Sequence, residues 1–555
     1  MASDAHHPLL DSSTNSNSSP MVLVFLLSLS AFAVSSVFLA PHLLKVSQHS
    51  DPSFLQHLCD QAYDPQACLL TISEAVKDNG AVQQSNGINI LKILLVKSLP
   101  QMTTAVEAAA SGIKLQGKNQ KDQGALADCL ELMDLSIDRV NYILSAVANW
   151  STHSDDAHTW LSGVLTNHAT CLDAIADTTQ QSMKVLLQDL ISKTRTSLAV
   201  VASLSASKKD ENLRTLNGGF PSWILARDRK LIESTSSNIQ ANVVVAKDGS
   251  GNFKTIQEAV ESAPDKSKTR YVIYVKKGTY KENVDVGKKK KNVMIVGDGM
   301  DLTIITGSLN VVDGSTTFKS ATLAVAGDGF ILQNVCVQNT AGPEKHQAVA
   351  LRVSADLSVI NGCLIDAYQD TLYAHNQRQF YRNCFITGTI DFIFGNAAVV
   401  LQNCQIIARK PMPHQKNMVT AQGRIDPNQN TGTSIQRCKI LASPDLESVQ
   451  SSIRTYLGRP WKEYSRTVVL QSYIRGHIHP AGWAEWDGDF ALKTLYYGEF
   501  ANNGPGADTS NRVKWPGYHV ITDPNEARKF TVAELIQGGE WLKSTGVSYT
   551  EGLYE

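Results

Sequence analysis

The chain has 555 residues, of which 43% are hydrophobic and 19% are charged. This length exceeds one ordinary domain, and the composition excludes collagen-like and intrinsically disordered chains. The net charge of −1 hides an asymmetry, because residues 1–240 hold 17 Lys+Arg against 22 Asp+Glu, whereas residues 241–555 hold 34 against 30. The mildly basic C-terminal part suits an acidic polymer as partner. We expect no nucleic-acid partner.

Residues 21–40, MVLVFLLSLSAFAVSSVFLA, carry no charge and are just long enough to span a bilayer. A cleaved signal peptide and a retained signal anchor both fit, since Ala31-Phe32-Ala33 resembles a small-residue cleavage site. The preceding leader has no Lys or Arg, so the positive-inside rule does not orient the segment. We therefore expect entry into the secretory pathway, delivery to the extracellular space or cell wall, and membrane contact only through this segment.

Residues 51–205 are expected to form an all-α domain. Between residues 126 and 147, apolar side chains recur at three- and four-residue intervals, as on one face of an amphipathic helix. Residues 182–204 follow the same pattern. Together these stretches predict a small four-helix bundle.

Four cysteines of this region are expected to pair. Cys59 and Cys68 bracket a predicted hairpin, whereas Cys129 and Cys171 lie in separate predicted helices. Because disulfides are permissible in a secreted protein, we expect the pairs Cys59–Cys68 and Cys129–Cys171. Asn149 begins an Asn-Trp-Ser acceptor for glycosylation.

Residues 206–240 predict a polar linker. The linker contains the basic stretch RDRKLIE, in which Arg229 and Lys230 would suit a processing protease. A solvated charged linker is an equal alternative on composition alone. The expected organisation is a tail (1–50) with the signal or anchor segment (21–40), a helical domain (51–205), the linker (206–240) and a β-rich domain (241–555).

From residue 241 onward, short β-branched runs alternate with Gly- and Asn-containing turns, which is the pattern of strands. A repeat marked by cysteine runs through them at sequence intervals of 27, 21, 20 and 34, at Cys336, Cys363, Cys384, Cys404 and Cys438. This period favours a right-handed parallel β-helix over a β-sandwich, whose strands should be more closely spaced. Equivalent residues of stacked coils lie about 4.8 Å apart. We therefore expect a Cys384–Cys404 disulfide and buried free thiols at the other three positions.

The same period aligns four polar side chains. Gln347, Gln369, Asp370 and Asp391 follow one another at sequence intervals of 22, 1 and 21, so they should lie on one face of three successive coils. Two neighbouring carboxylates do not ionise equally, because their pKa values move apart. One protonated and one ionised carboxylate make an acid and a nucleophile or base, and two amides can donate hydrogen bonds to an oxyanion.

These carboxylates need a cationic partner, and the stretch LGRPWKEYSR (457–466) supplies Arg459. A guanidinium can hold a carboxylate at two points, and the ring of Trp461 would stack on a sugar. Each polar residue alone is compatible with a structural role, since polar side chains stacked along a solenoid often satisfy one another. Their conjunction on one register indicates an active site.

At these positions the sequence resembles the plant pectin methylesterases. Five segments characteristic of that family occur in the right order: GTYKE (278–282), QAVAL (347–351), YQDTL (368–372), DFIFG (391–395) and LGRPW (457–461). Residues 51–205 resemble the family's inhibitor-like pro-region, including its two cysteine pairs. The stretch RKLI (229–232) resembles the processing site, with Ile where Leu is commoner.

The resemblance implies a role for each site residue. Asp391 corresponds to the nucleophile and Asp370 to the general acid and then base, whereas Gln347 and Gln369 correspond to amides that stabilise the oxyanion. The implied substrate-binding positions are Thr317, Gln347, Tyr373, Phe394, Arg459 and Trp461. The Cys384–Cys404 disulfide also has a counterpart in the family.

The implied activity is hydrolysis of the methyl esters of pectin (methyl-esterified homogalacturonan), with no metal or organic cofactor. The expected partners are pectin, a processing protease and the pro-region itself, acting as an autoinhibitor or in retention during secretion. A glycosidase would also use two carboxylates, whereas an elimination enzyme would need Asp ligands for calcium. The alternatives outside catalysis are a catalytically dead binding solenoid and a helical domain that acts as an inhibitor.

Overall fold

The computed structural model describes residues 52–78, 86–115, 120–176, 178, 180–212 and 240–555, which belong to one compact unit. The predicted signal or anchor segment (21–40) and the processing residues Arg229 and Lys230 lie outside the described residues. Among the residues that are described, no helix combines the length and the apolar character needed to cross a membrane.

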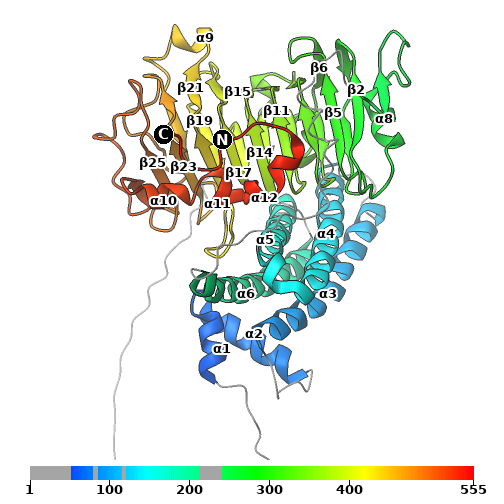
Figure 1. Ribbon diagram of the computed structural model, residues 1–555, viewed down its shortest axis with the longest axis vertical. Coiled ribbons are helices and arrows are strands. Elements are labelled where there is room, and N and C mark those ends of the chain that lie inside the picture. The colour runs from blue at the N-terminus through cyan, green and yellow to red at the C-terminus, as the bar shows by residue number, and fades with distance from the viewer. Residues whose placement is uncertain (1–51, 79–85, 116–119, 177, 179, 213–239) are drawn as a thin grey trace, which may run out of the picture. The chain divides into compact units, whose positions relative to one another are not determined.

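Most of the described residues up to 212 are helical, and the predicted bundle is confirmed (Figure 1). The long helices pack lengthwise, α4 against α3 and α5, and α6 against α5 and α3. Their side chains at the predicted three- and four-residue spacing, among them Leu126, Met133 and Val140, are fully buried. The helices are α1 (Pro52–Cys59), α2 (Pro65–Asp78), α3 (Gly87–Leu115), α4 (Gln120–Ala146), α5 (Trp150–Ala174) and α6 (Gln181–Asn212).

The last of these helices, α6, continues beyond residue 205, where the linker was expected to begin, and ends at Asn212. Both disulfides expected for the bundle are present. Cys59 and Cys68 join the α1–α2 hairpin with a Cα–Cα distance of 5.8 Å, and Cys129 and Cys171 join α4 to α5 with a Cα–Cα distance of 4.7 Å.

From Val243 onward the chain winds into the coils of a parallel β-helix, and a typical coil adds one strand to each of three sheets (Figure 1). The first sheet holds β1 (Val243–Val245), β2 (Tyr271–Val275), β5 (Val293–Gly297), β8 (Ile331–Gln333), β11 (Ser358–Asn361), β14 (Arg378–Arg382), β17 (Ala398–Gln402), β20 (Gly432–Gln436), β23 (Arg466–Leu470), β25 (Tyr496–Phe500) and β26 (Tyr518–Val520). The second holds β3 (Gly278–Lys281), β6 (Thr303–Gly307), β9 (Cys336–Asn339), β12 (Leu364–Asp366), β15 (Phe385–Gly388), β18 (Gln405–Ala408), β21 (Lys439–Ala442) and β24 (Tyr473–Ile474). The third holds β4 (Val284–Val286), β7 (Leu323–Val325), β10 (Leu351–Val353), β13 (Leu372–Ala374), β16 (Ile393–Gly395), β19 (Asn417–Gln422) and β22 (Thr455–Gly458).

Regular stacking of apolar side chains from coil to coil builds the core of the β-helix. In the third sheet Leu351 pairs with Leu372 and Leu372 with Ile393, and all three side chains are buried. Their spacing along the chain is the repeat period that the sequence predicts. Short helices decorate the coils: α8 (Ile256–Ser262), α9 (Pro444–Glu447), α10 (Pro524–Arg528), α11 (Val532–Ile536) and α12 (Gly538–Trp541). Helices α11 and α12 cover the outer face of the first sheet.

The cysteine repeat differs from the sequence alignment at its first member. Cys336 pairs with Leu364, so Cys363 aligns with Val335, and Cys336 lies one position out of the cysteine column. The cause is the turn before each strand, which requires a left-handed residue: Asn334 and Gly362 both have positive φ, of 55° and 62°. Asn and Gly tolerate this conformation, and the two residues align in the register. Cys363 directly follows Gly362, whereas Val335 separates Asn334 from Cys336.

The predicted disulfide between Cys384 and Cys404 is not formed, and both residues are buried free thiols, as are Cys336, Cys363 and Cys438. The thiols of Cys384 and Cys404 instead donate to backbone carbonyls of the preceding coil, at 3.4 Å from the oxygen of Ile360 and 3.6 Å from that of Tyr381. Each sulfur therefore has a partner of its own, although the register places the two residues on adjacent coils.

We expect alkylation of the denatured, unreduced protein to modify five cysteines and to leave four in disulfides, because the thiols of the β-helix are all free. Mass spectrometry of the alkylated peptides checks the number. Three modified cysteines together with a linked Cys384–Cys404 peptide would contradict the structure and restore the disulfide.

Candidate active site

Three successive coils bring the predicted polar residues together. Gln347 forms a parallel bridge with Gln369, and the backbone N–H of Asp370 donates to the oxygen of Ile390 at 3.1 Å. Asp370 therefore lies one coil before Asp391. Both aspartates have left-handed backbones, with φ of 65° and 51°. Such strain in a non-glycine residue is typical of functional sites, because it aims a side chain that regular backbone would direct elsewhere.

Arg459, just after β22, holds Asp391 at two points. Its Nε lies 2.8 Å from Oδ1 and its Nη2 lies 2.6 Å from Oδ2. The backbone N–H of Arg459 donates to the oxygen of Thr420 at 3.0 Å, which fixes the arginine to the neighbouring strand β19. Because only 6% of Asp391 is exposed, this two-point contact supplies most of the compensation for a buried charge.

The two carboxyl groups differ in their surroundings. Burial raises the pKa of Asp370 well above its ordinary value, and the charge of Asp391 raises it further, while Arg459 opposes both. Burial also raises the pKa of Asp391 above its ordinary value, but the hydrogen bonds and charge of Arg459 limit this rise. Asp370 is therefore the group that keeps its proton, and Asp391 is the group that ionises. One buried acid beside one carboxylate is the arrangement needed for acid and nucleophilic catalysis.

A row of aromatic rings runs beside the carboxylates. Tyr373 stacks on Phe394 with ring centroids 4.2 Å apart, and Phe394 meets Trp461 at 5.9 Å. Tyr373 also meets Phe318 edge to face at 6.4 Å. Thr317 directly precedes Phe318 and is half-buried. The structure thus gathers the predicted positions Thr317, Tyr373, Phe394 and Trp461 along one groove.

Two site residues were missed from the sequence. Phe318 extends the aromatic row, and Trp486 covers the face of Arg459, whose guanidinium carbon lies 4.2 Å from the ring centroid. Trp486 lies in an irregular connection between β24 and β25, where no period relates it to the other coils. The adjacency of Phe318 to Thr317 was the one available signal.

Helix α5 lies along the aromatic row and buries it. Only 3% of Tyr373 and 6% of Phe394 are exposed, and both belong to the same hydrophobic cluster as the bundle. The hydroxyl of Thr170 on α5 lies 3.0 Å from Nε2 of His375, next to Tyr373. The gap that remains between α5 and this part of the groove has a volume of only about 10 Å³, which holds no more than about one water molecule.

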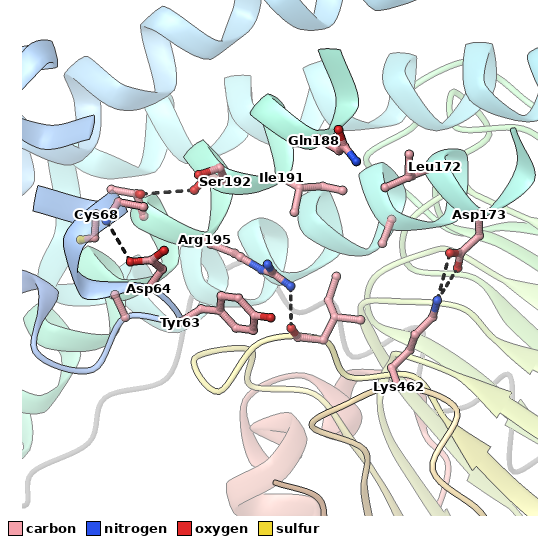
Figure 2. A pocket seen from close by; sticks show the side chains of 15 residues that line it. Tyr63, Asp64, Cys68, Leu172, Asp173, Gln188, Ile191, Ser192, Arg195 and Lys462 are labelled. Atoms are coloured by element: carbon pink, nitrogen blue, oxygen red, sulfur yellow. Dashed lines mark hydrogen bonds and ion pairs between the residues drawn. The ribbon is translucent and has the colours of Figure 1, made fainter. Parts of the chain in front are cut away.

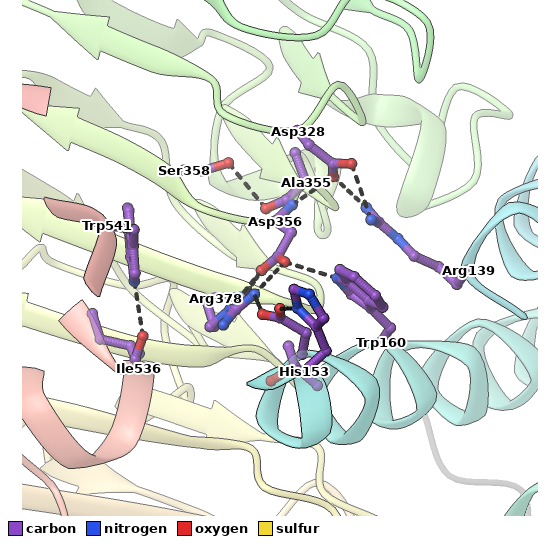
Figure 3. A network of polar contacts seen from close by, with 12 residues as sticks. Arg139, His153, Trp160, Asp328, Ala355, Asp356, Ser358, Arg378, Ile536 and Trp541 are labelled. Carbon is purple, nitrogen blue, oxygen red and sulfur yellow. Dashed lines mark hydrogen bonds and ion pairs between the residues drawn. The ribbon is translucent and has the colours of Figure 1, made fainter. Parts of the chain in front are cut away.

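Charged contacts hold the bundle on the β-helix around this groove (Figure 3). Arg139 of α4 donates to both carboxylate oxygens of Asp328, one of them at 3.0 Å. Arg378 of β14 pairs with Asp156 of α5 and with Asp356 of the β-helix, both at 2.7 Å. Since Arg139, Arg378 and Asp356 are almost fully buried, these contacts fix the positions of α4 and α5 on the β-helix.

The groove remains open on the other side of Arg459. A pocket of about 480 Å³ lies there, and all of its lining residues belong to the β-helix, including Lys416, Tyr456 and Trp486. Helix α5 therefore covers the aromatic row, whereas this pocket beside Arg459 is lined by the β-helix alone. The described residues contain no cluster of three or more His, Cys, Asp or Glu side chains placed to hold a metal ion.

Comparisons with known proteins agree with this geometry. Residues 242–539 match the sequence model of the family described as Pectinesterase, and residues 53–213 match the one described as Plant invertase/pectin methylesterase inhibitor. Pectinesterase 2.1 of Solanum lycopersicum is 62% identical over 90% of this chain and 91% of its own length. Pectinesterase/pectinesterase inhibitor 18 of Arabidopsis thaliana is 52% identical over 99% and 100%. The solved pectin methylesterase from carrot is 64% identical, with a TM-score of 0.57, over 57% of this chain and 100% of its own.

We expect Arg459→Gln to raise the pKa of Asp391 by about one unit or more, because the buried carboxylate loses its cationic partner. The group would then ionise only at higher pH. Carbon-13 NMR of protein labelled at aspartate measures this pKa, with the signal identified by its loss in Asp391→Asn. Arg475→Gln, which removes a surface pair with Glu447, serves as the control. An unchanged pKa of Asp391 would show that Arg459 does not set its ionisation.

Proposed function

The chain belongs to the pectinesterase family, and on this premise we propose that Asp391, held by Arg459, is the nucleophile with which it demethylates pectin. The enzyme hydrolyses methyl-esterified homogalacturonan to free galacturonate and methanol. The observation that carries the proposed role is the two-point contact of Arg459 with Asp391. This contact favours ionisation of one buried carboxyl group beside another that stays protonated.

In the first half of the reaction, a carboxylate oxygen of Asp391 attacks the carbonyl carbon of the methyl ester. The carbonyl oxygen becomes an oxyanion, which Gln347 and Gln369 stabilise by donating hydrogen bonds from their side-chain amides. Asp370 then gives its proton to the methoxide as the C–O bond breaks, and methanol leaves. The product of this half is a covalent anhydride between Asp391 and the galacturonate.

In the second half, Asp370 is ionised and acts as the base. It takes a proton from a water molecule, whose oxygen attacks the carbonyl carbon of the anhydride. Collapse of this second tetrahedral intermediate releases galacturonate and returns Asp391 to its carboxylate form. The raised pKa of Asp370 suits this dual role, because a group that holds its proton in the first half takes one up readily in the second.

The aromatic row binds the sugar chain. Trp461, Phe394 and Tyr373 offer ring faces and edges along the groove, and Thr317 lies at its far end beside Phe318. Flat apolar ring faces suit the apolar faces of pyranose rings, while the polar groups at the groove floor position the ester over Asp391.

In the uncut chain, α5 occupies the aromatic half of this binding groove, and the bundle is therefore an autoinhibitor in our proposal. A sugar unit and Thr170 would compete for the same space above Tyr373 and His375. Proteolysis in the linker at Arg229 and Lys230 would free the enzyme, because charged and apolar contacts alone would then hold the two parts together.

An extracellular place of action agrees with the plant pectinesterase family. Passage through the secretory pathway, by a signal peptide or anchor at 21–40, is part of the same proposal. The glycosylation acceptor Asn149 supports it, since this residue is exposed directly before α5.

Asp391→Asn in residues 232–555 should lower methanol release from highly methylated pectin by about 10³-fold or more, since the amide is no nucleophile. Methanol and new reducing ends are assayed in parallel with the wild type. Asp265→Asn is a matched control, because this exposed aspartate pairs with Lys290 on the same β-helix. New reducing ends without methanol would replace the esterase with a glycosidase, and full activity of Asp391→Asn would refute the nucleophile.

The docking of α5 depends on a close approach at Gly163. A Cβ atom added there would lie 2.1 Å from Nε2 of Gln377, and the three nearest atoms all belong to Gln377 of the β-helix. A side chain added at this position therefore meets Gln377 of the β-helix first.

We expect Gly163→Leu to raise the activity of the uncut chain about tenfold or more, towards that of residues 232–555, because the new side chain wedges α5 off the groove. Methanol release by the uncut chains measures the effect. Asp155→Leu, an exposed position on the same helix, is the control. An uncut wild-type chain as active as residues 232–555 would refute autoinhibition.

A further inference from the structure

Lys462 of the β-helix and Asp173 of the bundle form an ion pair at the end of the aromatic row (Figure 2). The Nζ atom of Lys462 lies 2.9 Å from Oδ1 and 2.8 Å from Oδ2 of Asp173. Asp173 belongs to the last turn of α5, whereas Lys462 directly follows Trp461. The lysine thus binds a carboxylate at the boundary between the β-helix and the bundle, next to the aromatic row.

Lys462 lines two neighbouring cavities. It lines the narrow gap beneath α5 together with Tyr373 and Trp461, and its Nζ lies 5.3 Å from the ring centroid of Trp461. It also borders a pocket of about 380 Å³, which lies between the bundle and the β-helix. Without the bundle, a sugar unit bound on Trp461 would lie within reach of Lys462.

We propose that Lys462 binds the carboxylate of a demethylated galacturonate unit next to the unit under attack, and that Asp173 occupies this place in the uncut chain. The inference rests on the proposed function, and it adds a residue that reads the methylation state of the substrate. An aspartate and a galacturonate present the same carboxylate group, whereas a methyl ester is neutral. The ammonium group of Lys462 therefore attracts the aspartate and the galacturonate, but it interacts only weakly with the neutral methyl ester.

Two consequences follow from this assignment. The enzyme prefers an ester whose neighbour is already demethylated, so each product unit favours the next reaction along the chain. Demethylated pectin also competes with Asp173 for Lys462, which makes the product of the reaction a competitor of the autoinhibitory bundle. Electrostatic recognition of this kind acts mainly on specificity, because it distinguishes charged from neutral partners.

Kinetics of residues 232–555 on two substrates test the proposal. This part has its own hydrophobic core, and the carrot enzyme similar to it consists of this part alone. The substrates are oligogalacturonates of one length, either fully methylated or about half demethylated. We expect Lys462→Gln to lower kcat/KM about tenfold on the half-demethylated substrate, because one charged hydrogen bond is lost. On the fully methylated substrate, kcat/KM should stay within about twofold of the wild-type value.

Two further variants complete the experiment. Lys462→Arg keeps the charge and should keep the preference, whereas Lys439→Gln removes an exposed lysine on β21 and should change neither substrate. Calorimetric binding of unmethylated oligogalacturonate to residues 232–555 gives a readout apart from catalysis, and Lys462→Gln should weaken it about tenfold. Equal effects on both substrates, or unchanged binding of the unmethylated oligomer, would overturn the proposal. Absence of methanol release by the wild type on either substrate would instead refute the proposed function.

Discussion

Hydrogen bonding between successive parallel coils is the constraint on which the site depends. The coils that carry Leu351, Leu372 and Ile393 have nearly equal lengths, so these side chains stack in register and build a continuous core. The same register carries polar residues at the adjoining corner, where Asp370 and Asp391 lie on consecutive coils. A slip of one residue would turn each core side chain outward and separate the two carboxyl groups. Core packing and catalytic geometry are therefore secured by the same interaction.

Burial makes these two carboxyl groups different from one another. Removing a carboxylate from water is costly unless a partner compensates, and Arg459 compensates Asp391 at two points. Asp370 has no such contact in the described structure and keeps its proton. Trp486 covers the face of the guanidinium, which restricts both water and rotation of Arg459. The two carboxyl groups thus differ before any substrate binds, and this asymmetry supports the proposed roles of Asp370 as acid and Asp391 as nucleophile.

The bundle contacts the same side chains of the groove that are proposed to bind the sugar chain. Helix α5 places apolar surface and Thr170 against the aromatic row, and it places Asp173 on Lys462. Buried charge pairs such as Arg139 with Asp328 add orientation at the edge of the groove. Such an interface holds firmly while the linker is intact, because the effective concentration of the two parts is high.

Much of the fold and most of the site could be predicted from the sequence. A fixed coil length converts separation along the chain into neighbourhood in space, which is why Gln369, Asp370 and Asp391 were placed together. The helical pattern of the bundle likewise reports its own buried face. The alignment of the first cysteine was wrong, because the left-handed turn residue sets the register of each coil. Asn334 therefore aligns with Gly362, and Cys336 lies one position out of the cysteine column.

The sequence by itself determined the two architectures and the placement of Gln347, Asp370 and Asp391 on successive coils, because these depend on local periodicity or on contacts between adjacent coils. It also predicted the two disulfides of the bundle. Tertiary structure alone decided that the thiols of Cys384 and Cys404 bond to carbonyls instead of to each other. It also decided that Trp486 covers Arg459 and that α5 covers the aromatic row. These contacts join segments without a common period, and packing and charge complementarity in three dimensions select them.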